Sequence, residues 1–87
     1  MAVTVDLTYD MSKALGVSSF ELEDPATVKD VVRQTRERLG AGGADFETLA
    51  RVAAVAVNGV LINHRKGMKT RLAPGDRVAF VKAAAGG

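Results

Sequence analysis

The side chains that most often carry catalytic chemistry are sparse in this 87-residue sequence. It has one histidine, His64, and no cysteine, which excludes disulfides, cysteine nucleophiles and thiolate metal sites. A transition-metal site would have to rely on scattered carboxylates, so we expect no bound metal. No serine lies in a nucleophile-elbow motif. The candidate that remains is the carboxylate of Gly87, which ends the sequence after three alanines and Gly86.

A backbone carboxylate is ionised at neutral pH and is a poor electrophile, so it must be activated before a nucleophile attacks it. The residues before it suit delivery into a narrow site, because Ala83, Ala84 and Ala85 add little bulk and glycine adopts backbone angles that other residues avoid. Extended, residues 82–87 span at most about 20 Å. We therefore divide the chain into a folded domain, residues 1–82, and a flexible tail, residues 83–87.

The rest of the sequence predicts a small α+β domain that positions this tail. Residues 3–9 and 17–23 alternate apolar and polar side chains, which is typical of half-buried strands. We expect them to form an antiparallel hairpin across a polar connection at residues 10–16. The side chains predicted to face the core are Val3, Val5, Leu7 and Tyr9 in the first strand, and Ser18, Phe20 and Leu22 in the second.

A helix is predicted from residue 28 to residue 39. Thr27 can cap it, Asp30 suits the positive end of its dipole, and apolar residues recur with a period of 3.6. Gly40 stands where a left-handed cap ends a helix. A second cap at Asp45 predicts a short helical turn that carries Phe46.

The last part of the sequence predicts short strands and turns. Asn58-Gly59 favours a type I′ turn between two strands within residues 52–62, because both central residues of that turn need positive φ. Pro74-Gly75 precedes a last strand at residues 77–81. One main helix packed on a mixed sheet would account for this order of elements.

Charge is distributed unevenly along the chain, although the net charge is only +2. Residues 1–47 hold nine acidic and five basic residues, whereas residues 48–87 hold one acidic and seven basic residues. The basic residues at positions 64–71 either solvate a loop or face an acidic partner. Nucleic-acid binding is disfavoured, because no aromatic residue is interleaved with them. We find no signal peptide and no apolar run long enough to cross a membrane, so we expect a cytoplasmic protein.

Four segments in this order resemble the MoaD/ThiS-type sulfur carriers of the ubiquitin-like β-grasp superfamily: ATVKDVV, VAVNG, LAPGDRVAF and the final GG. This group includes the small subunit of molybdopterin synthase and the thiamine sulfur carrier, and the resemblance covers nearly the whole chain. It implies a β-grasp fold and a protein cosubstrate that is not an enzyme and binds no cofactor tightly. Many molybdopterin-type members carry a Pro-Pro pair before the last four residues, where this chain has Lys-Ala-Ala. That departure counts against molybdopterin synthase as the specific partner.

The resemblance also implies a mechanism and its residues. A ubiquitin-activating-type enzyme would adenylate Gly87 with ATP, and a sulfur donor would displace AMP to leave a thiocarboxylate for a sulfur-accepting synthase. Gly86 would be the required neighbour. Leu61 and Val81 match positions at which such carriers present an apolar patch to their enzymes, although either residue can instead belong to the core. Ala83, Ala84 and Ala85 would lie in the partner's channel.

An alternative within the same superfamily is a protein modifier, whose activated Gly87 is joined to lysines of target proteins. Both functions use the same adenylate, so the sequence does not separate them. It also leaves open the pathway that receives the sulfur, whether molybdenum cofactor, thiamine or another metabolite.

Overall fold

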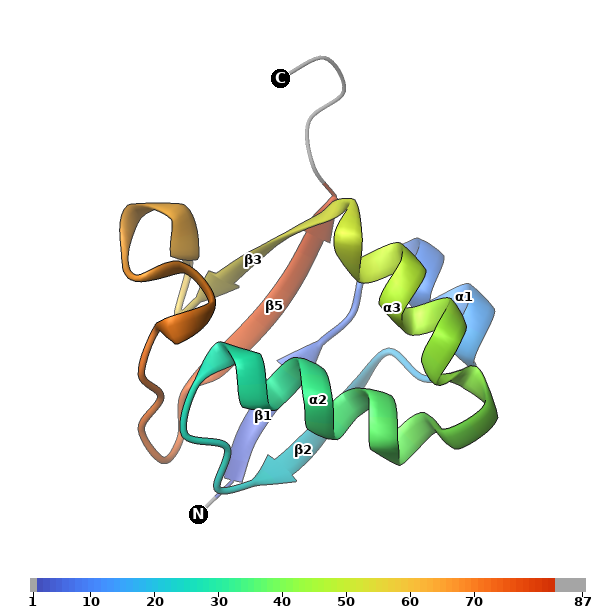
Figure 1. Cartoon of the computed structure of the whole chain (residues 1–87), viewed down its shortest axis with the longest axis horizontal. Helices are drawn as coiled ribbons and strands as arrows, with labels where there is room; N and C mark the ends of the chain where they lie inside the picture. The colour runs from blue at the N-terminus through green and yellow to red at the C-terminus, as the bar shows by residue number, and fades with distance from the viewer. Residues whose placement is uncertain (1, 83–87) are drawn as a thin grey trace.

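The computed structural model describes residues 2–82, which form a mixed sheet covered by helices on one face (Figure 1). The sheet order is β2-β1-β5-β3-β4, in which β1 and β5 are parallel and all other neighbours are antiparallel. This confirms the expected α+β, β-grasp arrangement. The strands are β1 (Ala2–Asp6), β2 (Ser19–Glu23), β3 (Ala53–Val57), β4 (Val60–Leu61) and β5 (Arg77–Lys82).

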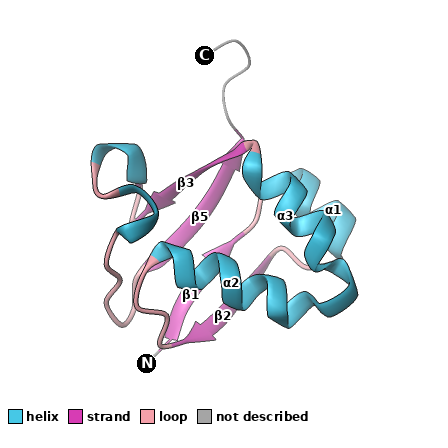
Figure 2. Ribbon diagram, in the orientation of Figure 1, coloured by secondary structure: helices cyan, strands magenta, loops and turns pink. Residues whose placement is uncertain are grey.

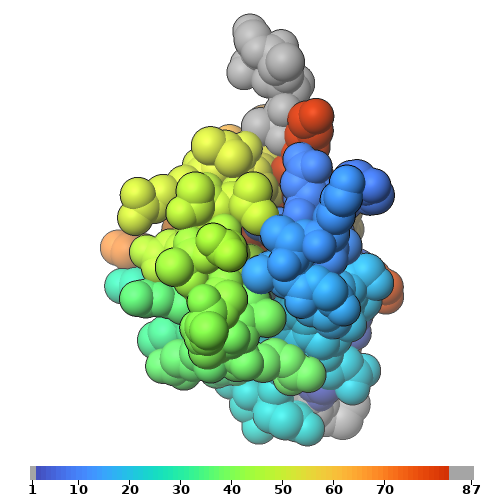
Figure 3. Space-filling view, turned by 90° about the vertical axis from the view of Figure 1, so that its right-hand side faces the viewer, coloured from blue at the N-terminus to red at the C-terminus, as the bar shows by residue number. Residues whose placement is uncertain are grey.

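Three α-helices lie on the same side of the sheet (Figure 2). Helix α2 crosses the sheet, and α1 and α3 pack beside each other at one end of it (Figure 3). None of the helices within residues 2–82 has the length and apolar character needed to cross a membrane. The helices are α1 (Tyr9–Leu15), α2 (Val28–Leu39) and α3 (Gly43–Arg51), with 3-10 turns η1 (Gly40–Gly42), η2 (Ile62–His64) and η3 (Gly67–Lys69).

Helix α2 begins and ends where the sequence predicts. The Thr27 side chain accepts a hydrogen bond from the Asp30 N–H at 3.3 Å, and the Asp30 carboxylate accepts one from the Thr27 N–H at 3.2 Å. This capping box satisfies two backbone donors at once. Gly40 follows the helix with a φ of 54°. The apolar stripe faces the sheet, with Val28 and Val31 fully buried.

The secondary structure predicted for residues 7–16 was wrong, although Leu7 packs against the core as expected. Strand β1 ends at Asp6, and the Thr8 hydroxyl accepts a hydrogen bond from the Met11 N–H at 3.0 Å, which starts α1 in place of a polar connection. Gly16, at φ 75°, ends this helix. Tyr9 is therefore not a core residue but lies on the surface, 76% exposed, while Met11 is fully buried. The register of β2 also leaves Ser18 outside the strand and exposed, whereas Phe20 and Leu22 are buried as expected.

The short turn predicted after residue 45 is a full helix, α3. Asp45 is not its cap, because the helix begins at Gly43, directly after η1, and Asp45 lies within its first turn. Phe46 is fully buried and meets Phe80 edge to face, with ring centroids 5.4 Å apart. A Cβ atom on Gly43 would lie 2.7 Å from the Arg36 carbonyl oxygen, so the close approach of α2 and α3 requires glycine here.

The register divides the sheet residues between two faces. Val55 pairs with Phe80 and Val57 with Val78, and these four side chains are buried beneath the helices. Because side chains alternate along a strand, the intervening residues face the other way, where no helix of residues 2–82 covers them (Figure 2). This uncovered side is called the open face below. The turn between β3 and β4 has the predicted form, with Asn58 at φ 51° and Gly59 at φ 85°.

Candidate docking surface at the end of the last strand

The residues predicted to be chemically reactive lie outside the described part of the chain. They are Gly86 and Gly87, together with the three residues expected to lie within the partner's channel, Ala83, Ala84 and Ala85. The structure instead defines the strand that leads to them. Strand β5 lies in the middle of the sheet between β1 and β3, and its last residue, Lys82, pairs with Ala53. The sheet thus fixes the position from which the carboxyl-terminal segment starts.

Two helix ends surround this starting position. A small cleft of about 40 Å³ joins Lys82 to Thr8 and Asp10 at the start of α1 and to Leu49 and Val52 at the end of α3. Figure 3 shows the end of β5 in red between the blue residues near α1 and the yellow residues near the end of α3. A partner that receives the segment after Lys82 therefore meets both the sheet and these helix ends.

Leu61 and Val81 both lie on the open face. Val81 stands opposite Ala54 across the β3–β5 pair, and Leu61 stands opposite Ala56 across the β3–β4 pair. Their exposed fractions are 37% for Leu61 and 38% for Val81, so the interpretation of either as a core residue is wrong. We call Ala54, Leu61, Ala79 and Val81 the apolar sheet patch.

The other half of the open face is polar. The Arg77 guanidinium contacts the Asp6 carboxylate through Nε and, at 3.1 Å, through Nη2, and the Ser19 hydroxyl donates to the same carboxylate at 3.0 Å. The hydrogen bond from Arg77 lowers the pKa of Asp6 below its ordinary value, against the opposing effect of partial burial. The apolar sheet patch and the Arg77–Asp6 ion pair thus lie next to each other on the open face.

Sequence reasoning did not identify three exposed apolar residues near this surface: Tyr9, Val52 and Met68. Val52, 71% exposed, belongs to the end of α3, where its N–H bonds to the Leu49 carbonyl at 3.3 Å. Its place in a run of apolar residues made it resemble part of the following strand. For Tyr9 a usable signal existed, because a cap residue at position 8 and a glycine at position 16 bracket a two-turn helix.

The basic segment forms a separate surface. A cleft of about 390 Å³ is lined by His64, Arg65, Lys66, Thr70 and Arg71. Its basic side chains are exposed, and none of them forms an ion pair with another residue of the described chain. No acidic residue occurs between positions 62 and 75, so the segment itself carries only basic charges. Asp76 follows it, and the hydrogen bond from the Ala73 N–H and the charge of Arg65 contribute to the lowered pKa of that carboxyl.

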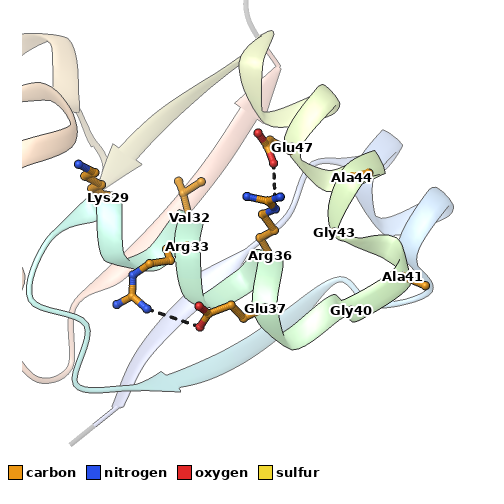
Figure 4. A pocket seen from close by; sticks show the side chains of 10 residues that line it. All are labelled: Lys29, Val32, Arg33, Arg36, Glu37, Gly40, Ala41, Gly43, Ala44 and Glu47. Carbon is orange, nitrogen blue, oxygen red and sulfur yellow. Dashed lines mark hydrogen bonds and ion pairs between the residues drawn. The ribbon is translucent and has the colours of Figure 1, made fainter.

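The groove between α2 and α3, about 750 Å³, does not offer catalytic chemistry (Figure 4). Its lining includes two carboxylates, and both are paired: Glu47 with Arg36 at 3.0 Å and Glu37 with Arg33 at 3.5 Å. No histidine, serine or threonine lines it. Within residues 2–82 no cluster of three acidic or histidine side chains is placed to hold a metal ion.

A match to a protein-family model decides the relationship. The model of the ThiS family matches residues 10–87, which include the whole of β5 and the final two glycines. The chain belongs to the ThiS family. The resemblance to MoaD/ThiS-type carriers is thereby confirmed, whereas no curated protein sequence matches the chain.

Solved structures of similar proteins agree with this fold. The solution structure of small archaeal modifier protein 1 from Methanosarcina acetivorans superposes with a TM-score of 0.80 at 20% identity, over 99% of this chain and 96% of that one. A chain in the crystal structure of the Amycolatopsis orientalis BexX/CysO complex gives 0.76 at 27% identity, over 99% and 100%. A chain in the complex of subunits 1 and 2 of the Helicobacter pylori molybdopterin-converting factor gives 0.64 at 21% identity, with both chains fully covered.

Proposed function

We propose that this member of the ThiS family is a sulfur carrier that acts as a protein cosubstrate through the carboxylate of Gly87. The observation that supports the proposal is the family match, which extends through residue 87 and so includes the last two glycines. The domain contributes a rigid support for them, because Lys82 is held in the sheet beside Ala53. The proposed reaction takes place in the cytoplasm.

The proposed chemistry proceeds in two steps. A carboxylate oxygen of Gly87 attacks the α-phosphate of ATP on a separate activating enzyme, which forms the acyl-adenylate and releases pyrophosphate. A sulfide equivalent then attacks the carbonyl carbon, AMP leaves, and the thiocarboxylate remains. ATP belongs to the activating enzyme, so the carrier itself needs no tightly bound cofactor.

Docking is proposed to use the apolar sheet patch together with the helix ends around Lys82. Two residues of the patch, Leu61 and Val81, are exposed, and Val81 lies on the strand that leads to Gly87. Exposed apolar residues beside polar ones are typical of protein interfaces. Two similar structures are complexes, of BexX with CysO and of the two molybdopterin-converting subunits. By analogy, the same patch would meet first the activating enzyme and then a sulfur-accepting synthase.

Mass spectrometry of the intact protein from its native cell tests the proposed cargo. We expect a fraction whose mass reflects replacement of one oxygen by sulfur, with the change located at Gly87 by fragmentation. A variant that lacks Gly87, expressed in the same cell, provides the control and should not show the change. Only the unmodified carboxylate, under conditions in which the pathway is active, would contradict the proposal.

Substitution of Val81 by aspartate tests the docking surface. Because the residue is exposed on the open face, we expect little change in the free energy of unfolding but a loss of about tenfold in kcat/KM for adenylation, since a charge at an apolar contact is desolvated without a partner. Val60→Asp is the matched control, because Val60 is also exposed but lies opposite Val57, outside the patch. Equal losses of kcat/KM in both variants would show that the apolar sheet patch is not the docking surface.

The second candidate is a protein modifier, supported by the structural similarity to small archaeal modifier protein 1. In that case a lysine amine of a target protein attacks the same adenylate and AMP leaves, which forms an isopeptide bond to Gly87. Proteolysed lysates distinguish the two functions. Because trypsin cleaves after Lys82, an Ala-Ala-Ala-Gly-Gly remnant on lysines, dependent on this chain, would support modification. A thiocarboxylate without such remnants would support sulfur transfer alone.

A further inference from the structure

Strand β3 has an open edge. It pairs with β5 along its whole length, but only Ala56 and Val57 pair with β4. No strand within residues 2–82 therefore pairs with residues 53–55 on the side away from β5. Asn58 donates its N–H to the Arg77 carbonyl at 2.8 Å, so the alternation of an antiparallel strand turns the backbone polar groups of Ala53 and Val55 away from β5. An edge of this kind is a template for an added strand.

A cleft of about 330 Å³ follows this edge. Residues 53–55 line it, together with the end of α3 on one side and with η2 and η3 on the other. In Figure 1 the end of α3 lies near the start of β3 and the 3-10 turns lie near its other end. Exposed apolar side chains flank the cleft, Val52 from α3 and Met68 from η3. An added strand would turn every second side chain toward such residues.

The rim of the cleft is cationic. Arg51 lines it, and the turns that form its other wall continue into the basic surface with Lys66 and Lys69. Arg51 has an exposed ion pair with Glu47 at 3.5 Å, whereas neither lysine has an ion pair within residues 2–82. No acidic residue lies between positions 62 and 75. The basic side chains of the rim would therefore attract a bound segment that carries carboxylates.

We propose that the open edge of β3 binds an extended, acidic segment of a partner protein as an added strand. Its apolar side chains would pack near Val52 and Met68, and its carboxylates would face the basic rim. A peptide fits better than a nucleic acid, because the edge offers backbone hydrogen bonds and no aromatic side chain lines the cleft. The site goes beyond the proposed chemistry of Gly87 and does not depend on it.

The position of the edge suggests its use. Ala53 pairs with Lys82, so an added strand would lie two strand spacings, about 10 Å, from the point where the carboxyl-terminal segment starts. A partner bound here would hold that segment in register with its own active site. The charge on the rim would also make the association dependent on salt.

Nuclear magnetic resonance titration of the full-length chain with short peptides tests the proposal. The probe is EVEVEVEV with blocked ends. We expect amide shifts centred on residues 53–55, Leu61 and Met68, with intermolecular contacts to Ala53 and Val55. EEEEVVVV has the same composition without alternation, and KVKVKVKV has the alternation with the opposite charge. Both should bind at least about tenfold more weakly. EEEEVVVV cannot place all its apolar side chains on one face of a strand, and the lysines of KVKVKVKV are repelled by the basic rim.

Charge-reversing variants complete the test. Lys66→Glu and Lys69→Glu together should weaken the binding of EVEVEVEV by about tenfold, whereas Lys13→Glu on α1, which is not among the residues that line the cleft, should not. Equal binding of the control peptides, shifts away from the edge, or the same shifts with an oligodeoxythymidylate would overturn the proposal. Adenylation of Gly87 is measured separately without peptide, so a failure there contradicts the proposed function and leaves this site intact.

Discussion

The two faces of the sheet are built from the same strands but have opposite properties. On the helix-covered face, Val78 and Phe80 are buried among the helices. Their neighbour Val81, turned to the open face, is 38% exposed, and Arg77 forms an ion pair there. Buried and exposed apolar side chains are thus separated by a single residue step along β5. Substitutions on the first face should change the free energy of unfolding, and those on the second should change binding.

The largest expected contrast is between adjacent residues of β5. Phe80→Ala removes a buried ring that meets Phe46 edge to face, and we expect it to lower the free energy of unfolding by about 3–5 kcal/mol. Val81→Ala should lower it by no more than about 1 kcal/mol, because that side chain is 38% exposed and lies outside the buried core. Denaturant titration measures both values. Similar decreases in the free energy of unfolding at the two positions would contradict the difference proposed between the two faces.

The helix layer provides a second contrast, between neighbouring glycines. Gly43→Ala places a Cβ atom 2.7 Å from the Arg36 carbonyl oxygen, so α2 and α3 must move apart, and we expect a loss of about 1–3 kcal/mol in stability. A Cβ atom at Gly42 would meet nothing nearer than a Leu15 methyl carbon at 3.4 Å, so Gly42→Ala should cost less. Thermal unfolding of the two variants measures the difference, and we expect the lower Tm for Gly43→Ala. A lower Tm for Gly42→Ala would contradict the prediction.

A buried threonine on α2 is expected to make the protein less stable than a valine at the same position would. Thr35 is fully buried on α2, and its hydroxyl has no hydrogen-bond partner within the described residues. Thr35→Val keeps the shape and removes the unpaired hydroxyl, so we expect a gain of about 1 kcal/mol in the free energy of unfolding. Thr27→Val is the matched control, because it removes the α2 cap and should destabilise. A loss of stability in Thr35→Val would show that the hydroxyl is satisfied.

The smallest effect concerns pH and the open face. The hydrogen bond from Arg77 lowers the pKa of Asp6 in the folded state, so the ionised carboxylate stabilises the fold above the unfolded-state pKa. This contribution is lost as pH falls from the unfolded-state value through the lower folded-state value. An ordinary carboxyl group titrates between about pH 5 and about pH 2. Over this range Asp6→Asn should therefore show a smaller decrease in Tm than the natural chain. Identical decreases would show that the pair contributes nothing.

The parts of the fold that were predicted correctly are those governed by local rules. The capping box at Thr27 and the positive φ of Asn58 each depend on a few neighbouring residues, so the sequence reveals α2 and the hairpin after it. Helix α1 was missed because the alternation of β1 continues through Leu7 to Tyr9, past the residue where the chain changes direction. The burial of Met11 beneath α3 and the sheet is a tertiary contact that alternation does not encode.

The candidate site was predicted in part for the same reason. Alternation along residues 77–81 separates Val78 and Phe80 from Ala79 and Val81, but it does not tell whether Val81 is exposed. The exposure of Leu61 depends on the short pairing of β4 with β3, and that of Val52 depends on where α3 ends. Neither is a property of the local sequence. The open edge of β3 likewise appears only once the strand order is known.

The central claim is that the carboxyl terminus reacts while the domain only presents it. Adenylation by the activating enzyme encoded in the same genome, followed as pyrophosphate release, tests this most directly when the full chain is compared with a variant that lacks Gly87. We predict that the deletion abolishes pyrophosphate release and leaves Tm nearly unchanged. Continued release from the shortened chain, or a fall of many degrees in Tm, would contradict the account.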